Sequence, residues 1–273
     1  MTPPQQEEPE MSFWEHLEEL RMHIFRSLAA VFVLAVAAFL AKKFVFDVII
    51  LAPKNEHFIT NVLLCRAGEL LSIDALCIGK MNLQMQNINM SGQFMTHMYV
   101  SIVTGLIVAA PYIIWELWRF VMPALKPGEK RYSRGAVVVS SLLFICGVLF
   151  AYFLIVPLTI NFLGTYQVSQ EVPNQIHLNS YISTVLSVTL AVGIVFELPI
   201  LVYFLTKVGL VTPAFLKKNR KIMLVIVLVL SAIITPPDIF SQVLVCIPLM
   251  LLYEMSISIS KRVYRQRQAD LAG

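Results

Sequence analysis

Long runs of apolar residues constrain this chain more than any other feature of its sequence. Crossing the roughly 30 Å hydrocarbon core of a bilayer as a helix takes about 20 apolar residues, and most of the runs qualify. The chain is 58% hydrophobic and only 14% charged, against about 45–50% and 25% in soluble domains. We therefore expect an all-α, polytopic membrane protein. Its six candidate stretches are 24–40, 94–117, 136–163, 181–205, 222–234 and 239–259.

The lengths and prolines of these stretches predict the shape of the bundle. The fifth stretch is too short to cross without local thinning of the bilayer, and we expect both the fifth and the sixth helix to be short. Pro111, Pro157, Pro199 and Pro248 fall within predicted spans, where proline removes a backbone hydrogen bond and bends a helix. The expected fold is six transmembrane helices that form a concave bundle.

Basic residues gather on one side of the predicted bundle. They occupy the connections 126–134 and 217–221 and the tail 261–267, whereas only the first of the opposite loops contains Lys or Arg. By the positive-inside rule both termini are cytoplasmic. The net charge of +4 follows from this topology and does not indicate a nucleic-acid partner.

The chain divides into one membrane domain and two flanking segments. Residues 1–11 are rich in Pro, Gln and Glu and predict a disordered leader. Residues 12–262 form the domain, with an extended external loop over 52–92, and 263–273 form a cytoplasmic tail. The first apolar stretch lacks a small-residue cleavage site, so we do not expect a signal peptide. The segment 12–15 has the pattern of a capping box, and the helix after it is expected to lie along the membrane surface before it enters the bilayer.

The four cysteines differ in their surroundings. Cys65 and Cys77 lie in the external loop, where an oxidising compartment permits a disulfide, but their spacing alone leaves the pairing open. Cys146 and Cys246 lie within apolar stretches and are small apolar residues there. No Cys/His cluster has metal-ligand spacing, so we expect neither a metal nor a cofactor.

Glu197 is the only charged residue in the apolar run 182–204. A carboxylate at bilayer depth costs roughly 2.5–3.5 kcal/mol on insertion scales, so it indicates a functional site, although a protonated structural carboxylate would also fit. By contrast, Glu116 and Glu254 fall near cytoplasmic helix ends, where we expect them to be hydrated. The sequence has no HExxH, no aspartate pair within the spans and no Walker motif, so we do not expect an enzyme.

Two function classes fit these observations. An ion-coupled secondary transporter could use Glu197 as its coupling carboxylate, but six spans without a visible inverted repeat are a thin basis for it. A structural scaffold for other membrane subunits is the second class.

Several segments together resemble the TatC family, the multispanning subunit of the twin-arginine translocase. The segment 15–21 reads EHLEELR and is similar to the HLxELR signature of that family. The first cytoplasmic loop (WRF at 118–120, PAL at 123–125, EKR at 129–131), FELP at 196–199 and TPPD at 235–238 with FSQ at 240–242 match as well. The resemblance extends from residue 12 to about residue 262, and the external loop after Pro53 is longer than the family pattern.

The resemblance implies a receptor for twin-arginine signal peptides on folded cargo. Glu19 and Glu129 would receive the two arginines, since a guanidinium binds a carboxylate bidentately. Arg21 would orient Glu19, and Phe120 would pack nearby. Glu197 would be a polar site facing the hollow of the bundle.

The resemblance also implies a location in the cytoplasmic (inner) membrane of a bacterium, a set of partners and an energy source. A partner-helix interface for TatA/TatB-type single-span proteins would comprise Thr235, Gln242 and Asp238, although Asp238 is better placed to cap the sixth helix. Besides the lipid bilayer and the signal peptides, the protein would assemble with these partners into an oligomeric receptor complex. Transport in this family is driven by the proton-motive force.

Overall fold

The protein is almost entirely helical in its computed structural model, which describes residues 13–55, 57–71, 85–122, 127–167, 169, 174–234 and 239–272. Within those ranges, five helical segments are long and apolar enough to cross a membrane, which confirms a polytopic membrane protein. The five are His16–Leu40, Gly92–Val121, Gly135–Thr165, Leu178–Val208 and Gln242–Ala269.

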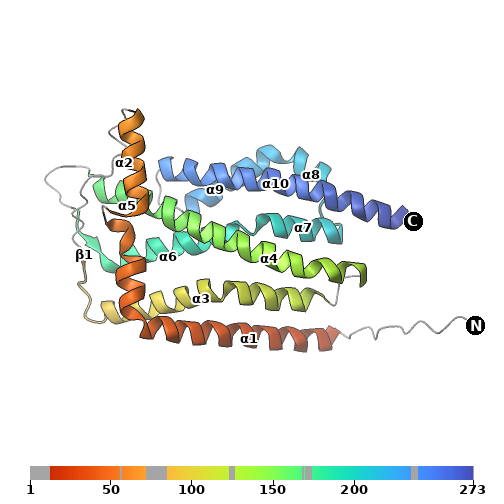
Figure 1. The fold of residues 1–273 in the computed structure, drawn as a ribbon, viewed down its shortest axis with the longest axis horizontal. Helices are drawn as coiled ribbons and strands as arrows, with labels where there is room; N and C mark the ends of the chain where they lie inside the picture. The colour runs from red at the N-terminus through yellow and green to blue at the C-terminus, as the bar shows by residue number, and fades with distance from the viewer. Residues whose placement is uncertain are drawn as a thin grey trace, which may run out of the picture.

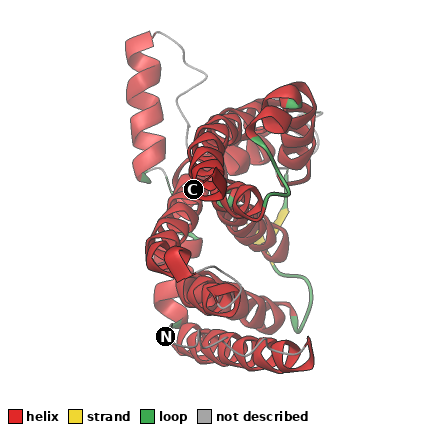
Figure 2. Cartoon of the chain, turned by 90° about the vertical axis from the view of Figure 1, so that its right-hand side faces the viewer, coloured by secondary structure: helices red, strands yellow, loops and turns green. Residues whose placement is uncertain are grey.

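Helix α1 (Phe13–Leu40) pairs with α3 (Gly92–Val121), and among the elements that the structure describes α1 packs extensively against α3 alone. The two helices lie side by side at the bottom of Figures 1 and 2. A Cβ added at Gly105 would lie 2.6 Å from the backbone nitrogen of Ala35. The absence of a side chain at Gly105 therefore sets how closely the two helices approach.

The prediction that the first helix lies along the membrane surface before it turns inward is wrong. Helix α1 continues for 28 residues from Phe13 to Leu40 without interruption. No Gly or Pro occurs between these residues, so the backbone has no point at which a helix readily bends.

Helices α4 and α6 form the centre of the bundle. Helix α4 (Pro127–Phe150) continues through the π-helix η5 (Ala151–Ile155) into α5 (Val156–Thr165). Helix α6 (Leu178–Val195) contributes Ile182, Val185 and Val192 to the main apolar core. A Cβ added at Gly147 of α4 would lie 2.7 Å from Phe196, so these helices also cross closely.

Two tyrosines fix the segment that crosses the end of the bundle opposite the termini. This segment comprises η1 (Phe44–Ile50), η2 (Ala52–Lys54) and α2 (Ile59–Leu71). The hydroxyls of Tyr152 and Tyr181 donate to the carbonyls of Ile49 and Ile50, at 2.8 and 2.9 Å, so carbonyls at the end of η1 are satisfied. Figure 1 shows α2 nearly perpendicular to the long helices.

A two-stranded parallel sheet ties two helix starts together at the same end of the molecule. Strand β1 (Met85–Gln86) precedes α3, and β2 (Ile176–His177) precedes α6. Met85 pairs with Ile176 and Gln86 with His177. This pairing brings the N-terminal ends of α3 and α6 close together.

The remaining helices are α7 (Leu198–Val208), α8 (Pro213–Lys218), α9 (Arg220–Ile234) and α10 (Ile239–Ala272). The short fifth helix is confirmed, since α9 has 15 residues. The prediction of a short sixth helix is wrong, because α10 has 34 residues. Its apolar part continues into the polar, basic residues that were expected to form a tail, and nothing in them stops a helix.

Both described ends of the chain lie at the same end of the helical bundle (Figure 1). The start of α1, the start of α4 and the end of α10 lie together at the right-hand end of Figure 1. In Figure 2 the helices are seen along their length and follow a curved row, from the α1–α3 pair upward to α8, α9 and α10. This curvature agrees with the predicted concave bundle.

Candidate functional site

Glu19 lies where the first turns of α1 pass the last turn of α3. Its side chain is 33% exposed, and His16 Nδ1 lies 3.8 Å from Glu19 Oε2. Oε2 is buried and accepts no hydrogen bond from the described residues. Since buried acceptors are nearly always paired, this oxygen is an unsatisfied anionic acceptor at the end of the bundle shared by both termini.

Phe120 holds the surroundings of Glu19 in place. Its ring stacks on His16, with centroids 4.4 Å apart and planes inclined by 17°, and it meets His23 edge-on at 6.2 Å. His16 is one helical turn before Glu19. Phe120 thus lies next to the turn of α1 that carries Glu19, through its contacts with these two histidine rings.

Glu116 is the buried carboxylate of this region, and the expectation that it would be hydrated is wrong. Only 1% of its surface is exposed. His23 Nδ1 is hydrogen-bonded to Oε2, the Tyr112 hydroxyl donates to Oε1 at 3.0 Å, and Arg119 Nη1 lies 3.5 Å from Oε1. The neighbouring helix α1, not water, surrounds this end of α3. Glu254 is partly exposed and pairs with Arg220 at 2.7 Å.

Arg21 makes no ion pair with Glu19. Residues two apart on a helix do not face each other, and the Arg21 guanidinium instead lies 6.0 Å from the ring centre of Phe25. Arg21 and Phe25 line a shallow apolar hollow on the outer side of α1, together with Leu17 and Leu20. The predicted orienting role of Arg21 therefore does not operate through direct contact.

Glu129 lies in the first turn of α4, and its side chain falls outside what the structure describes. The start of α4 is at the same end of the molecule as the start of α1 (Figure 1). Residues 19 and 129 thus lie in helical turns at the same end of the bundle, and their role as arginine receptors stays a prediction.

Glu197 occupies a break within the fourth span. Helix α6 ends at Val195, α7 begins at Leu198, and Pro199 lies in the first turn of α7. This break is the bend predicted from Pro199. A carboxylate at the break lies beside backbone groups that no longer follow one continuous helix.

Ser140 of α4 is the observed partner of Glu197. Its hydroxyl donates a hydrogen bond to Glu197 Oε2, whereas Oε1 is buried with no hydrogen-bond partner in the described chain. Ser140 is itself buried. The carboxylate is thus half satisfied, which leaves one acceptor for a further donor.

The predicted partner interface is only partly described. Thr235 and Asp238 lie outside the described residues. Gln242 is partly buried, and its Nε2 donates to the carbonyl of Leu228 at 3.1 Å. This bond joins the start of α10 to α9.

The predicted disulfide is also partly described. Cys65 lies in α2 and is disulfide-bonded, while Cys146 and Cys246 are free. Cys77 lies outside the described residues, so the Cys65–Cys77 pairing stays a prediction.

Two features of the site were not found from the sequence. The His23–Glu116 contact joins residues 93 positions apart, and the Ser140–Glu197 bond joins residues 57 apart. The available signal for the first was a histidine and a glutamate near the same end of adjacent predicted spans. Serine in an apolar stretch gave no signal for the second.

Comparisons with known proteins agree on one family. The sequence model described as "Sec-independent protein translocase protein (TatC)" matches residues 15–248. The TatC protein of Blattabacterium sp. subsp. Periplaneta americana is 41% identical over 263 residues, covering 96% of this chain and 99% of that protein. The TatCy protein of Bacillus subtilis is 31% identical over 263 residues, covering 96% and 94%.

The fold is similar to solved structures of the same family. A crystal structure of the twin-arginine translocase receptor TatC superposes with a TM-score of 0.68 at 34% identity, covering 91% of this chain and 99% of that chain. A second TatC structure, in the detergent DDM, gives a TM-score of 0.71 at 35% identity, covering 90% and 99%.

Proposed function

Because this chain belongs to the TatC family of Sec-independent protein translocase proteins, we propose that it is the translocase subunit that receives twin-arginine signal peptides. It recognises them at the cytoplasmic face and takes part in the export of folded proteins, driven by the proton-motive force. Because the family is one of protein translocases, we prefer this function to an ion-coupled transporter or a structural scaffold.

The unsatisfied oxygen of Glu19 carries this proposal. Glu19 Oε2 is buried, with no hydrogen-bond donor among the described residues, and His16 is held away by its stack on Phe120. A guanidinium supplies several N–H donors and a permanent positive charge, so it satisfies a carboxylate better than water or a lysine does. One arginine of the signal would bind here.

Glu129 is the proposed receptor for the second arginine. Its position in the first turn of α4, at the same end of the bundle as the start of α1 (Figure 1), supports this assignment. Two carboxylates on different helices match a pair of adjacent guanidiniums better than one carboxylate could. Arg21 faces the apolar hollow on α1, where it would lie beside the signal rather than beneath Glu19.

The proposed topology has six spans with both termini in the cytoplasm. The start of α1 and the end of α10 lie at one end of the molecule (Figure 1), as an even number of crossings requires. Helix α9 supplies the sixth crossing in addition to the five long segments. The basic residues of 217–221 and 261–267 gather at this end, in agreement with the positive-inside rule.

Glu197 and the α9–α10 turn are the proposed contacts for single-span partners of the TatA/TatB type. The free acceptor of Glu197 Oε1 suits a polar side chain of a partner helix. The same proposed interface includes Thr235, Asp238 and Gln242, which lie at or near the connection between α9 and α10 in the sequence. Several copies of the chain and its partners would then form the receptor complex.

Copurification tests the receptor function. The protein, in detergent, is incubated with a cargo bearing an Arg-Arg signal or the same signal with Lys-Lys, and only the first should be retained. Glu19→Gln should reduce retention by about tenfold or more, since a charge-assisted pair is lost. Glu18→Gln is the matched control, because Glu18 is an exposed neighbour on the same helix. Equal retention of both signals would refute the proposal.

A further inference from the structure

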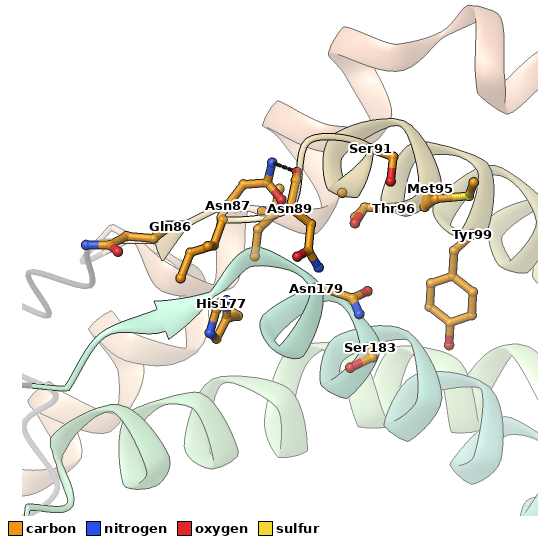
Figure 3. Close-up of a pocket in the computed structure, with 13 residues that line it drawn as sticks. Gln86, Asn87, Asn89, Ser91, Met95, Thr96, Tyr99, His177, Asn179 and Ser183 are labelled. Atoms are coloured by element: carbon orange, nitrogen blue, oxygen red, sulfur yellow. Dashed lines mark hydrogen bonds between the residues drawn. The ribbon is translucent and has the colours of Figure 1, made fainter.

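A pocket of about 470 Å³ lies at the end of the molecule opposite the termini. It is formed where β1 leads into α3 and β2 leads into α6, and Figure 3 shows its side chains converging from these two segments. The proposed receptor site does not use it. Its lining combines apolar surface with amide and hydroxyl side chains, among them Asn89, Asn179, Ser91 and Thr96.

The start of each of two long helices borders this pocket without a side-chain cap. Ser91 precedes the 30-residue α3 and His177 precedes the 18-residue α6, and neither side chain accepts a hydrogen bond from the first turn of its helix. The Gly92 N–H at the start of α3 donates to the Asn89 carbonyl at 2.9 Å, but the other N–H groups of an uncapped first turn are free, and the positive end of the helix dipole lies there. Such ends attract anions.

Thr96 gives an independent indication of a ligand. It lines the pocket and is only 3% exposed, and its oxygen is not among the fully buried polar atoms without a partner. In Figure 3 its hydroxyl lies on the pocket side of α3. The hydroxyl is therefore reached from the pocket, and an acceptor bound there would be within its reach.

The types of side chain that line the pocket indicate which class of ligand it would bind. None of the 13 residues drawn around the pocket in Figure 3 is an Asp or Glu, so nothing among them repels an anion. None is a Lys or Arg either, so recognition would depend on backbone N–H groups and neutral donors. Phosphate oxygens accept several hydrogen bonds at once and suit such a cluster of donors.

We propose that this pocket binds a phosphate group, through the N-terminal turns of α3 and α6, Thr96 and Asn179. The pocket lies where the spans Gly92–Val121 and Leu178–Val208 begin, which is the depth of lipid head groups. Met95, Tyr99 and Leu178 also line it and provide apolar contact for a lipid glycerol. The phosphate can therefore come from a phospholipid or from solution.

Asn179→Asp is the decisive variant. It preserves the shape of the side chain and places a carboxylate in the first turn of α6, where an acidic residue stabilises a helix. It should therefore leave folding intact and repel a phosphate, weakening binding by about tenfold. Asn55→Asp is the matched control, since it adds the same charge at an exposed position outside the pocket.

Thr96→Val removes only the hydroxyl and should weaken binding by about threefold, the effect of one net hydrogen bond. Its control is Thr184→Val, because the Thr184 hydroxyl is already bonded to the Ser180 carbonyl at 2.9 Å and does not line the pocket. Both threonines are helical, so any general effect of valine on helix stability is common to the two variants.

Native mass spectrometry of the purified protein distinguishes the sources. Phosphatidylglycerol and diacylglycerol with the same chains are titrated separately, and inorganic phosphate is titrated in a parallel thermal-shift experiment. Retention of phosphatidylglycerol above diacylglycerol, reduced by Asn179→Asp but not by Asn55→Asp, supports a lipid phosphate. Stabilisation by inorganic phosphate with the same variant pattern supports the free ion. If neither ligand distinguishes Asn179→Asp from Asn55→Asp, the proposal is overturned, whatever the outcome for signal-peptide binding.

Discussion

His23 of α1 is hydrogen-bonded to the carboxylate of Glu116 on α3, and both side chains are buried where the two helices meet. Tyr112 and Arg119 complete the surroundings of this carboxylate. Phe120 joins the cluster to His16 and so to the turn that carries Glu19. The structural contact between α1 and α3 is therefore continuous with the proposed receptor site.

Replacing Glu116 with alanine should destabilise the protein by about 1–3 kcal/mol, because the buried side chain of His23 would lose its hydrogen-bond partner and the partly exposed Tyr112 hydroxyl would lose its acceptor. Thermal unfolding in detergent measures the effect. Glu254→Ala is the control and should change stability by at most about 1 kcal/mol, since its pair with Arg220 is exposed. Equal effects of the two substitutions would show that the buried cluster does not stabilise the α1–α3 contact.

Gly105→Ala should separate α1 from α3 and cost about 1–3 kcal/mol, because the added Cβ would lie 2.6 Å from the Ala35 nitrogen. Thermal unfolding and protease sensitivity of α1 both measure this. Gly135→Ala in α4 provides the comparison, since its Cβ would meet nothing within 4 Å. Gly135→Ala should stabilise its helix by about 0.5–1 kcal/mol, so the two substitutions should act in opposite directions.

Phe120→Ala should weaken binding of an Arg-Arg signal by about tenfold, because the His16 ring loses its stack and no longer holds the surroundings of Glu19 fixed. Copurified signal measures it. Combined with Glu19→Gln, the loss should be less than the sum of the two separate effects, since both act on one contact. Phe215→Ala, at an exposed position on α8, should leave binding unchanged. If the two losses in signal binding were strictly additive, Phe120 would not act through the Glu19 site.

Ser140→Ala removes the observed donor to Glu197 and should slow export of a twin-arginine cargo by about fivefold, as expected for one hydrogen bond. Signal retention should be unchanged, since Ser140 is far along the chain from α1 and lies in another helix pair. Glu197→Ala should give a larger export defect, again with signal binding intact. Ser141→Ala is the matched control and should leave export unchanged, because the observed hydrogen bond to Glu197 comes from Ser140. Normal export in Ser140→Ala, with Glu197→Ala inactive, would exclude Ser140 from the function of Glu197.

The spans and the break at Glu197 could be predicted because their causes are local. Apolar length identifies a crossing helix, and Pro199 identifies the break wherever its neighbours lie. The burial of Glu116 could not be predicted this way, since its partner His23 is 93 residues away. The role of Gly105 in helix packing could not be predicted either, because it depends on how closely Ala35 of α1 approaches it.

Helix ends were the least predictable part of the fold. Residues 261–267 are polar and basic, which signals an exit from the membrane but not an end of helical structure, and α10 continues through them. Glu19 emerged as a site residue through the family resemblance, and the structure adds its unsatisfied Oε2. The phosphate pocket depends on pairing between β1 and β2, which no local pattern in the sequence indicates.

Among the described elements, α1 packs mainly against α3. Under the proposed function, a cargo bound through its signal at Glu19 would exert force on α1, and this force would reach the bundle mainly through α3, past the close crossing of Gly105 and Ala35. From α3 the force would pass to α4 and α6, its other neighbours, and so toward Ser140 of α4 and the break after α6 that holds Glu197.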